Sequence, residues 1–433
     1  MKRIMPLLLA ALLLAGCAAQ APGQNSAQSP VYAPGAAPLN QVALPEAPGA
    51  EDYDALAALR EAVSEEHKAA ILSFCAGSAQ QVLGDGKMDA NRLYSPISLY
   101  FALAMLAETA GGETRSEILA ALGADEAALA KTGDVYRLLY ADNEFSRLLL
   151  ANSAWVQSAQ GGAGAKGDFR QEALDSLAQR HFAQVFATDF AQESAGEAIG
   201  AWIQEQTNGL VGGGFQVPAE TLLLLINTVY FRSEWSSGFN EENTAPGAFH
   251  NGDGTESQCA FMHKVNSQPF TRTEQYTSAT LGLKGGEVRF ILPNEGVTPQ
   301  DILGGEGWAE ALSPSQESTG YGDVTWQAPK LDYSESMSLN EAAKALGIQA
   351  AFSPNFADFS PLCDSPLYVS GIHQQSAVSM DEKGIEAASY TDIALVGAAM
   401  PTDKAEMILD RPFIYVVYAG GLPLFVGVVN TMA

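Results

Sequence analysis

Three glycines within residues 162–167 have the spacing G-x-G-x-x-G, which in other proteins holds the pyrophosphate of a dinucleotide. They lie between an expected strand and an expected helix, and Asp189 follows the last glycine by 22 residues, where a ribose-binding acid belongs. However, residues 158–161 separate the strand from the glycines, and Lys166 and Asp168 stand where the helix should pack against a sheet. We therefore interpret the segment as a glycine-rich loop, and a dinucleotide-dependent enzyme is the weakest functional interpretation.

Other catalytic and metal-binding patterns are absent from the sequence. It contains neither the G-x-S-x-G turn of a hydrolase nor the H-E-x-x-H motif of a zinc protease. The five histidines are dispersed, and no C-x-x-C pair occurs among the four cysteines, Cys17, Cys75, Cys259 and Cys363. We therefore expect no metal, no cofactor and no enzymatic activity, and no disulfide is required.

Cys17 is the cysteine whose surroundings predict a modification. Lys2 and Arg3 precede an apolar stretch over residues 4–16, which is too short to span a membrane but is typical of an export signal. The stretch ends in Leu-Ala-Gly-Cys, which resembles the bacterial lipobox, where the cysteine receives a lipid and becomes the first mature residue. We expect residues 1–16 to be a lipoprotein signal peptide and Cys17 to anchor an exported, extracellular protein at the cell surface. The alternative is an ordinary signal peptide with an incidental cysteine.

The segment after Cys17 is predicted to be a tether. Residues 18–50 hold six prolines, three glycines and a single charge, Glu46, so they contain too little apolar surface to offset the entropy of ordering. No repeat and no second linker follows. We therefore expect residues 17–50 to be a lipidated cysteine and its tether, and residues 51–433 to be one large domain.

The composition excludes one broad class of partner. The chain is 47% hydrophobic, which is typical of a globular protein. It has 50 acidic and 23 basic residues, which gives a formal net charge of −27. Such a chain repels phosphate backbones, so we expect no nucleic-acid partner.

Two polar side chains interrupt apolar elements. Ser95 and the proline after it are favourable first residues of a helix, and residues 99–107 are apolar nearly all round, so this helix should be buried. Ser98 therefore lies in a buried first turn and requires a hydrogen-bond partner. Asn227 lies within the apolar run 222–231, an expected strand buried on both faces, and has the same requirement.

The end of the chain is expected to form a hairpin. Residues 413–419 and 422–429 have the pattern of two buried strands, and Gly420 and Gly421 between them suit a two-residue turn. With a helix-rich first half and a strand-rich second half, the sequence predicts a mixed α+β domain.

The segment 384–400 alternates in a way that a surface loop does not require. It contains no proline before Pro401, so it could pair as a strand throughout. The face with Glu386, Tyr390 and Asp392 carries both charges. The other face is apolar or small, with Ile385, Ala387, Ser389, Thr391, Ile393 and Leu395. This pattern favours a loop that can become a buried strand; the alternative is a plain surface loop.

Several groups of residues, taken in order along essentially all of 51–433, resemble conserved segments of the serpins. Any one group is a weak match, but together their order and spacing are specific. They are Asn91 with Ser95-Pro96-Ile97-Ser98, Ala151-Asn152-Ser153-Ala154-Trp155-Val156, Asn227-Thr228-Val229-Tyr230-Phe231 with Trp235, Leu346-Gly347, Asp381-Glu382-Lys383-Gly384-Ile385-Glu386-Ala387-Ala388, and Arg411-Pro412-Phe413.

The resemblance implies the serpin fold, with three β-sheets, about nine helices and an exposed reactive-centre loop near the C-terminus. It also implies a serine protease inhibitor that acts as a suicide substrate and a monomer. A protease cleaves the loop and becomes acylated, and the cleaved loop then inserts into the central sheet and traps it. The second interpretation is a non-inhibitory serpin with a binding or structural role.

The resemblance also assigns roles to residues. It implies a hinge at Glu382, Gly384, Ile385, Ala387 and Ala388, a shutter at Ser95, Ser98, Asn227 and His373, and a breach at Trp235. Inhibitory relatives usually have threonine or serine where Ile385 stands and a small residue where Tyr390 stands. Isoleucine is apolar and β-branched and Tyr390 lies on the outward face, so we expect insertion to survive these departures.

The reactive bond is expected between Ala398 and Ala399. Counted with Glu382 as the first residue, Ala398 is the seventeenth, which matches the family's spacing. The neighbouring residues from Val396 to Met400 include no basic or aromatic residue. A small, shallow specificity pocket suits such a bond. The expected partners are therefore elastase-like or subtilisin-like serine proteases, together with the membrane that holds the lipid anchor.

Overall fold

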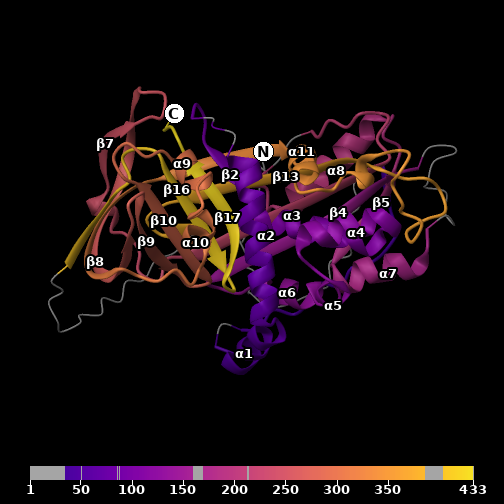
Figure 1. The fold of residues 1–433 in the computed structure, drawn as a ribbon, viewed down its shortest axis with the longest axis horizontal. Helices are drawn as coiled ribbons and strands as arrows, with labels where there is room; N and C mark the ends of the chain where they lie inside the picture. Colours follow the sequence, from indigo (N-terminus) through magenta and orange to yellow (C-terminus); the bar gives the residue numbers. More distant parts are fainter. Residues whose placement is uncertain are drawn as a thin grey trace, which may run out of the picture. The chain divides into compact units, whose positions relative to one another are not determined.

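Two β-sheets contain all the strands of the computed structural model, which describes residues 35–49, 51–84, 86, 88–158, 169–211, 214–385 and 403–432 (Figure 1). The eight-stranded sheet is named the central sheet here. In spatial order it consists of β1 (Ala36–Pro38), β5 (Ala183–Thr188), β4 (Ser146–Gln157), β6 (Leu223–Glu234), β14 (Gly384–Ile385), β13 (Val369–Met380) and β12 (Leu331–Ser338), with β3 (Ala141–Asp142) beside β4.

The second sheet has nine strands. In spatial order it consists of β15 (Asp403–Ile408), β11 (Gly320–Pro329), β8 (Glu256–Arg272), β9 (Tyr276–Leu283), β10 (Gly286–Pro293), β16 (Phe413–Ala419), β17 (Leu422–Val429) and β2 (Arg92–Tyr94), with β7 (Ala245–His250) beside β8. A separate third sheet was expected, but the described residues do not form one. The reason is the length of β8, which pairs with β7 and β11 along most of its length and with β9 at its end, and so joins both groups of strands.

The described residues form eleven α-helices, where about nine were expected, and two short 3-10 helices. They are α1 (Tyr53–Ala62), α2 (Glu65–Leu83), α3 (Pro96–Thr109), α4 (Gly112–Leu122), α5 (Glu126–Leu129), α6 (Thr132–Leu139), α7 (Gln171–Arg180), α8 (Glu193–Gln206), α9 (Pro299–Leu303), α10 (Trp308–Leu312), α11 (Asn340–Ala345), η1 (Glu241–Asn243) and η2 (Ala350–Phe352). The mixed α and β architecture predicted from the sequence is therefore confirmed.

Helix α3 lies in the middle of the larger hydrophobic core. All of its residues except Glu108 are buried, as the apolar composition on every side of the helix predicts. It packs against α2, α4 and strands of both sheets, so it connects the two sheets through the core. A smaller apolar cluster, centred on Trp155, Trp202 and Ile226, lies between α8 and the opposite face of the central sheet.

The hairpin expected at the end of the chain is present as β16 and β17. Both residues of its turn have positive φ, +57° at Gly420 and +77° at Gly421, which is the conformation of a type I′ turn. Glycine is favoured at both positions because a side chain would strain the backbone there.

One predicted boundary differs from the structure. The tether was expected to extend to residue 50, but Ala36–Pro38 form β1, which pairs antiparallel with β5 at the edge of the central sheet. The side chain of Asn40 accepts from the amide of Val185 at 2.9 Å and donates to the carbonyl of Ala183 at 3.0 Å. An edge strand supplies unpaired backbone groups, so a short segment can dock there with little apolar surface of its own.

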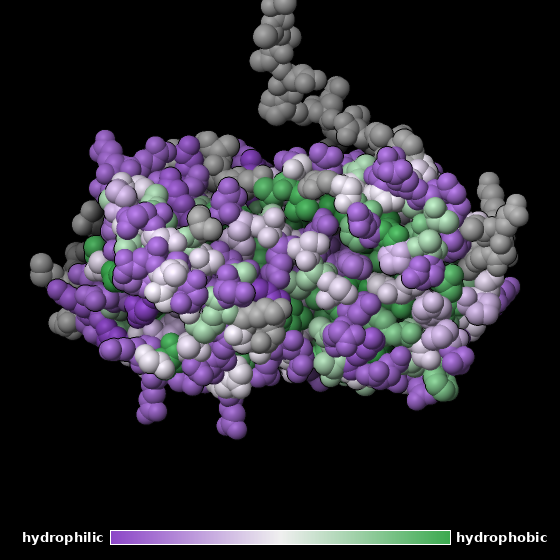
Figure 2. All heavy atoms as spheres, turned by 90° about the horizontal axis from the view of Figure 1, so that it is seen from above, coloured by the Kyte–Doolittle hydropathy of each residue, from purple (hydrophilic) through white to green (hydrophobic). Residues whose placement is uncertain are grey.

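The strand, helix and strand that flank the glycine-rich segment are also present, as β4, α7 and β5, with β4 and β5 parallel neighbours. The glycines at 162–167 lie outside the described residues. Hydrophilic side chains cover much of the face seen in Figure 2, with smaller apolar areas between them. Within the described ranges, none of the helices combines the length and the apolar character needed to cross a bilayer.

Candidate functional site

A chain of hydrogen bonds joins α3 to the two central strands β6 and β4. The hydroxyl of Ser98 donates to the Oδ1 atom of Asn227, whose Nδ2 atom donates to Oδ1 of Asn152. The Nδ2 atom of Asn152 then donates to the carbonyl oxygen of His181 at 2.9 Å. Ser98 is fully buried and Asn227 is 3% exposed, so each depends on these bonds for its polar atoms. The structure thus pairs the two polar side chains that the sequence singled out.

Ser95 connects the start of α3 to β13 through its backbone. Its amide donates to Oε1 of Gln374 at 2.8 Å, and Nε2 of Gln374 donates to its carbonyl oxygen at 2.8 Å. The Ser95 hydroxyl was expected to cap α3, but it makes no capping hydrogen bond and finds no partner among the described residues. The side chain of Gln374 therefore holds the first residue of α3 in place. Gln374 lies opposite Asn227 of β6, so it belongs to the same polar cluster.

His373 was expected in this cluster, and the structure places it elsewhere. In β13 successive side chains point to opposite faces, and Gln374 occupies the face toward α3. His373 therefore lies on the face toward α8, opposite Ile226, where its ring contacts the edge of Phe215 at a centroid distance of 5.3 Å. Burial lowers the pKa of His373, so its neutral form is favoured.

The ladder between β6 and β13 covers only part of the two strands. The parallel pairing begins at Val369 with Leu223 and ends at Gln375 with Thr228. Beyond that point, residues 229–232 of β6 and 376–379 of β13 do not pair with each other in the described part of the chain. The hydroxyls of Thr228 and Ser376, which lie where the strands separate, are buried without a hydrogen-bond partner among the described residues. This point is named the fork.

The far end of the fork is occupied by β14, whose residues Gly384 and Ile385 both belong to the predicted hinge. Gly384 pairs with Glu234 and Ile385 with Ser233, both antiparallel, and Ile385 also faces Met380 of β13. Gly384 has φ of +153°, and a Cβ atom at this position would collide with the carbonyl oxygen of Ser233. Ile385 is 3% exposed and lies in the larger core, so an apolar residue suits this position.

The side chain of Glu382 stabilises the turn between β13 and β14. This side chain is 6% exposed, accepts from the Thr244 hydroxyl at 2.6 Å, and pairs with the Lys330 ammonium at 2.8 Å. Burial alone would raise the pKa of Glu382, but the bonds from Lys330 and Thr244 outweigh it and lower the pKa. Trp235 supports the same turn, because its Nε1 atom donates to the carbonyl oxygen of Asp381 at 2.8 Å.

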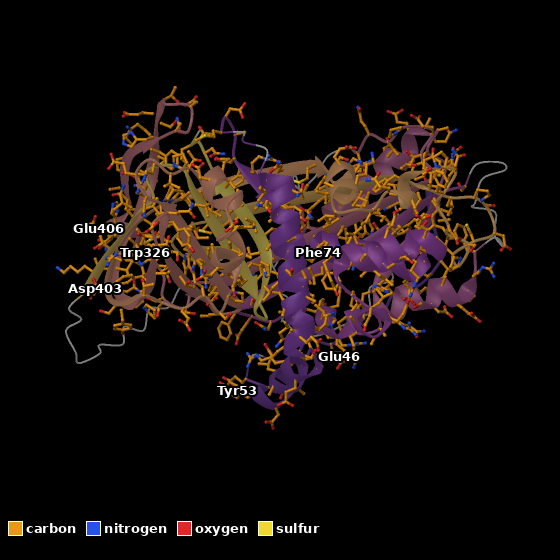
Figure 3. The ribbon with its side chains drawn as sticks, viewed as in Figure 1. Glu46, Tyr53, Phe74, Trp326, Asp403 and Glu406 are labelled. Carbon is orange, nitrogen blue, oxygen red and sulfur yellow. The ribbon has the colours of Figure 1, made fainter. Side chains whose placement is uncertain are left out.

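The chain returns to the described part at β15, which pairs parallel with β11. The guanidinium of Arg272 pairs with the Asp403 carboxylate at 3.3 Å and donates to the carbonyl oxygen of Lys404. Figure 3 labels Asp403 and Glu406 on this strand, at the left edge of the view. Ala387, Ala388, Ala398, Ala399 and Cys17 lie outside the described residues.

Two members of the cluster around Asn227 were missed at the sequence level. Asn152 was part of the matched segments, but nothing in its own surroundings indicated that it faces Asn227. Gln374 could have been found by counting back in steps of two from Met380 through Val378, both of which are buried. The family resemblance assigned the role to His373, the residue before Gln374 in β13.

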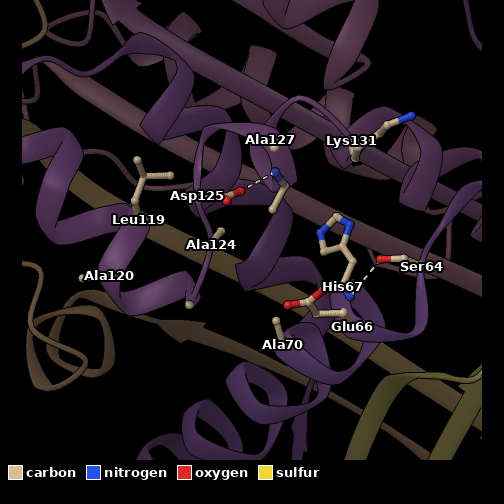
Figure 4. A pocket seen from close by; sticks show the side chains of 12 residues that line it. Ser64, Glu66, His67, Ala70, Leu119, Ala120, Ala124, Asp125, Ala127 and Lys131 are labelled. Carbon is tan, nitrogen blue, oxygen red and sulfur yellow. Dashed lines mark hydrogen bonds between the residues drawn. The ribbon is translucent and has the colours of Figure 1, made fainter.

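A surface cavity of about 650 Å³ lies among α2, α4 and α5 (Figure 4). His67 lines it, and Nε2 of this histidine contacts the Tyr100 hydroxyl at 3.0 Å. Burial lowers the pKa of His67. The cavity shares no residue with the fork or the hinge. Among the residues that the structure describes, no group of His, Cys, Asp and Glu side chains could hold a metal ion.

Comparison with known proteins gives consistent results. Residues 70–432 match the family model described as Serpin (serine protease inhibitor). Serpin-Z1B of Triticum aestivum is 30% identical over 381 residues, which cover 79% of this chain and 90% of that protein. The native structure of the thermophilic serpin tengpin superposes with a TM-score of 0.74 at 25% identity and covers 86% of this chain and 95% of its own. Thyroxine-binding globulin complexed with thyroxine gives 0.72 at 23% identity, with 85% and 99% coverage.

Proposed function

The chain belongs to the serpin family, and from this premise we propose that it is a suicide inhibitor of serine proteases with small specificity pockets. A protease would attack the bond between Ala398 and Ala399 and become acylated. The freed loop would then insert into the central sheet before the acyl bond is hydrolysed. Each molecule would therefore be consumed once.

The observation that carries the proposal is the position of β14 at the open end of the fork. Because β14 runs antiparallel to β6, each further loop residue would pair one residue back along β6, beyond the pairs Gly384–Glu234 and Ile385–Ser233. Continued in this register, Leu395 would lie opposite Leu223, the first residue of β6. The fork already separates the upper part of β6 from β13, so insertion would need only the lower ladder to open.

This register agrees with the alternation in the sequence. Ile385 faces the larger core, so Ala387, Ser389, Thr391, Ile393 and Leu395 would follow on that face. In the same register Thr391 would lie opposite Asn227, where a hydroxyl can join the polar cluster. The charged face with Glu386 and Asp392 would point away from the larger core, toward the side of the sheet on which α8 packs.

The energy for insertion would come from the new ladder. A strand added between β6 and β13 gains backbone hydrogen bonds on both sides, each worth about 0.5–1.5 kcal/mol net. The uninserted form would then be maintained by a kinetic barrier rather than by equilibrium. In the register of β14, Ala398 would lie opposite Glu220, three residues before the start of β6 and about 40 Å from Ile385, the length of 13 residues of strand. Displacing the protease in this way would distort its catalytic residues, whose chemistry depends on accurate placement.

The proposal is tested by incubating the protein with pancreatic elastase and with trypsin. We expect a complex with elastase that survives boiling in detergent, slower reaction with trypsin, and an intact mass of the released peptide that places the cut after Ala398. Ala398→Arg should shift the preference toward trypsin, since it supplies the charge that a trypsin pocket binds.

Faster inhibition of trypsin than of elastase by the unmodified protein would show that the bond is misplaced. Cleavage of the loop without any stable complex would instead favour a non-inhibitory serpin with a binding or structural role.

We further propose that the inhibitor is exported and held at the cell surface by a lipid on Cys17. The basis is the Leu-Ala-Gly-Cys sequence after an apolar stretch. Cys17→Ser should release the protein from the membrane fraction or leave it unprocessed. Unchanged membrane fractionation of this variant would contradict the anchor.

A further inference from the structure

A buried histidine in the cavity of Figure 4 has one ring nitrogen without a hydrogen-bond partner among the described residues. His67, in the first turn of α2, is 8% exposed, and the Tyr100 hydroxyl of α3 holds its Nε2 atom at 3.0 Å. The other nitrogen, Nδ1, is not sealed from solvent, and His67 lines the cavity, so Nδ1 opens into it. A polar atom of a buried side chain that faces an open cavity can hold a group of a ligand.

The cavity walls suit the apolar part of a ligand. Short apolar side chains line them and leave space between α2, α4 and α5. They are Ala70 of α2, Leu119 and Ala120 of α4, Ala124, and Ala127 and Ala128 of α5. The volume of about 650 Å³ lies within the range of small-molecule sites, which is about 300–1,000 Å³.

The charges at the rim favour a cation. Glu66 of α2 and Asp125, the N-cap residue of α5, both line the cavity, and neither carboxylate forms an ion pair with a described residue. Lys131 also lines the rim, but its ammonium pairs with the carboxylate of Asp134 at 3.1 Å. Figure 4 shows this ammonium pointing away from the ring of His67. The opening therefore has two carboxylates that a cationic ligand could neutralise.

We propose that this cavity binds an arylalkylamine, a small molecule in which a short chain joins a primary ammonium to an aromatic ring. The ammonium would lie between the carboxylates of Glu66 and Asp125 and donate to Nδ1 of His67, and the ring would contact the alanines. The Tyr100 hydroxyl can accept as well as donate, so the imidazole can adopt the tautomer in which Nδ1 accepts. The site shares no residue with the fork or the hinge, and the proposal does not depend on inhibitory function.

The protonation of His67 supports a cationic ligand. Burial lowers the pKa of His67 and outweighs the nearby carboxylates of Asp125 and Asp134, which raise it, so the neutral ring is favoured. The other charged groups that face the ring are Glu66 and Lys131, while α4 contributes only apolar residues and α3 a neutral hydroxyl. A neutral imidazole can accept from an ammonium, whereas a protonated one cannot and would repel it.

The first experiment compares three probes that share an indole ring. Tryptamine carries an ammonium, 3-ethylindole is neutral and indole-3-propionate is an anion. Titration calorimetry of the full chain at neutral pH should give one site for tryptamine with a Kd on the order of 0.1 mM, as expected for about twelve heavy atoms. The neutral probe should bind several-fold more weakly, and the anion more weakly still. Equal affinities for the three probes, or no binding of tryptamine, would overturn the proposal.

The second experiment locates the bound probe by nuclear magnetic resonance. The chain has five histidines, so the ring signals of His67 can be assigned by their loss in His67→Gln. Tryptamine should shift these signals more than those of the other histidines. It should also lower the pKa of His67 further, because the ammonium and a proton compete for Nδ1. Binding that leaves the His67 signals unchanged would place tryptamine elsewhere and contradict the site.

The third experiment separates charge from shape. Asp125→Asn retains a residue that caps α5 but removes a carboxylate, so the affinity for tryptamine should fall several-fold while that for 3-ethylindole is unchanged. Ala120→Trp should fill the cavity from the last turn of α4 and abolish binding of both probes. Ala69→Trp, at an exposed position of α2 outside the lining, is the matched control and should bind normally.

Two further results would contradict the proposal. Equal losses for both probes in Asp125→Asn would remove the argument for a cation. Unchanged binding of tryptamine in Ala120→Trp, or the same loss in Ala69→Trp, would show that this cavity is not the site.

Discussion

Two polar clusters lie on either side of the fork. The lower cluster, on the side where β6 and β13 pair, contains only hydroxyl and amide side chains, from Ser98, Asn152, Asn227 and Gln374. The upper cluster, on the side of β14, joins the carboxylate of Glu382 to the ammonium of Lys330. Both clusters hold strands that must separate if the sheet is to accept another strand. The lower one is deeply buried and its side chains do not titrate. The upper one depends on an ion pair whose lysine side chain is 43% exposed.

The difference predicts different responses. A buried neutral group that loses its hydrogen-bond partner lowers the free energy of unfolding, and this loss does not depend on salt or pH. A half-exposed ion pair contributes less to stability. It is weakened by added salt and by a pH at which one partner loses its charge. We therefore expect the lower cluster to set how firmly the ladder is closed, and the upper cluster to make the hinge responsive to its surroundings.

The largest effect is expected from Ala387→Arg, which tests whether the fork is used at all. In the register of β14, residue 387 would lie opposite Phe231 on the core face, where an unpaired guanidinium costs several kcal/mol. Trapping of elastase should be lost while the loop is still cleaved as a substrate. Ala388→Arg, on the opposite face, is the matched control and should retain more activity. Stable complexes at the unmodified stoichiometry with Ala387→Arg would exclude insertion as the mechanism.

The second effect tests the lower cluster. Asn227→Leu should leave the Ser98 hydroxyl and the Oδ1 atom of Asn152 without partners, at about 1–3 kcal/mol for each buried group. The urea midpoint of unfolding should fall clearly, and it should fall equally at low and high salt. Asn355→Leu changes an exposed asparagine and serves as the control. Equal losses in the two variants would mean that the cluster around Asn227 does not stabilise the sheet.

A smaller, pH-dependent effect is expected from Glu382→Gln. The native pKa of Glu382 is lowered, so its contribution is present above the ordinary glutamate value of about 4.3 and is lost as the pH falls through the native pKa. The variant should therefore be less stable by about 1 kcal/mol at pH 7, a value discounted for the exposure of Lys330, and should approach the unmodified protein in acid. Thermal unfolding from pH 3 to pH 7 measures the difference. A constant difference across this range would argue against the ion pair as the source.

The smallest effect is expected from His373→Phe, which keeps an aromatic ring against Phe215 and should change stability by less than about 1 kcal/mol. The native pKa of His373 is lowered, so its contribution is present above about pH 6.5 and is lost as the pH falls through the native value; the variant should lose this dependence. Gln374→Leu, one residue away, should destabilise more, because it removes both bonds to the Ser95 backbone. A larger loss of stability in His373→Phe than in Gln374→Leu would indicate that His373 belongs to the polar cluster around Asn227.

The sequence predicts those features whose causes are local. The buried helix α3, the strand around Asn227 and the glycine turn between β16 and β17 follow from apolar periodicity and turn chemistry. The need of Ser98 and Asn227 for partners was also predictable, because burial of a polar atom implies a hydrogen bond. Which groups meet that need is set by strand register over long distances, so Asn152 and Gln374 were missed and His373 was placed one residue out of phase. The docking of residues 36–38 escaped prediction for a related reason: the composition of a segment does not record an open strand edge elsewhere in the fold.

The same short strand β1 has a consequence for contacts between molecules. The edge strands of the central sheet have backbone groups that could pair with a strand from another copy. On one side the edge strand is β1, which is three residues long and ends in Pro38, whose nitrogen cannot donate a hydrogen bond. On the other side it is β12, which carries the exposed Asp332. A short strand with a proline at one edge and an exposed aspartate at the other, in a chain of net charge −27, discourages sheet-to-sheet association at both edges.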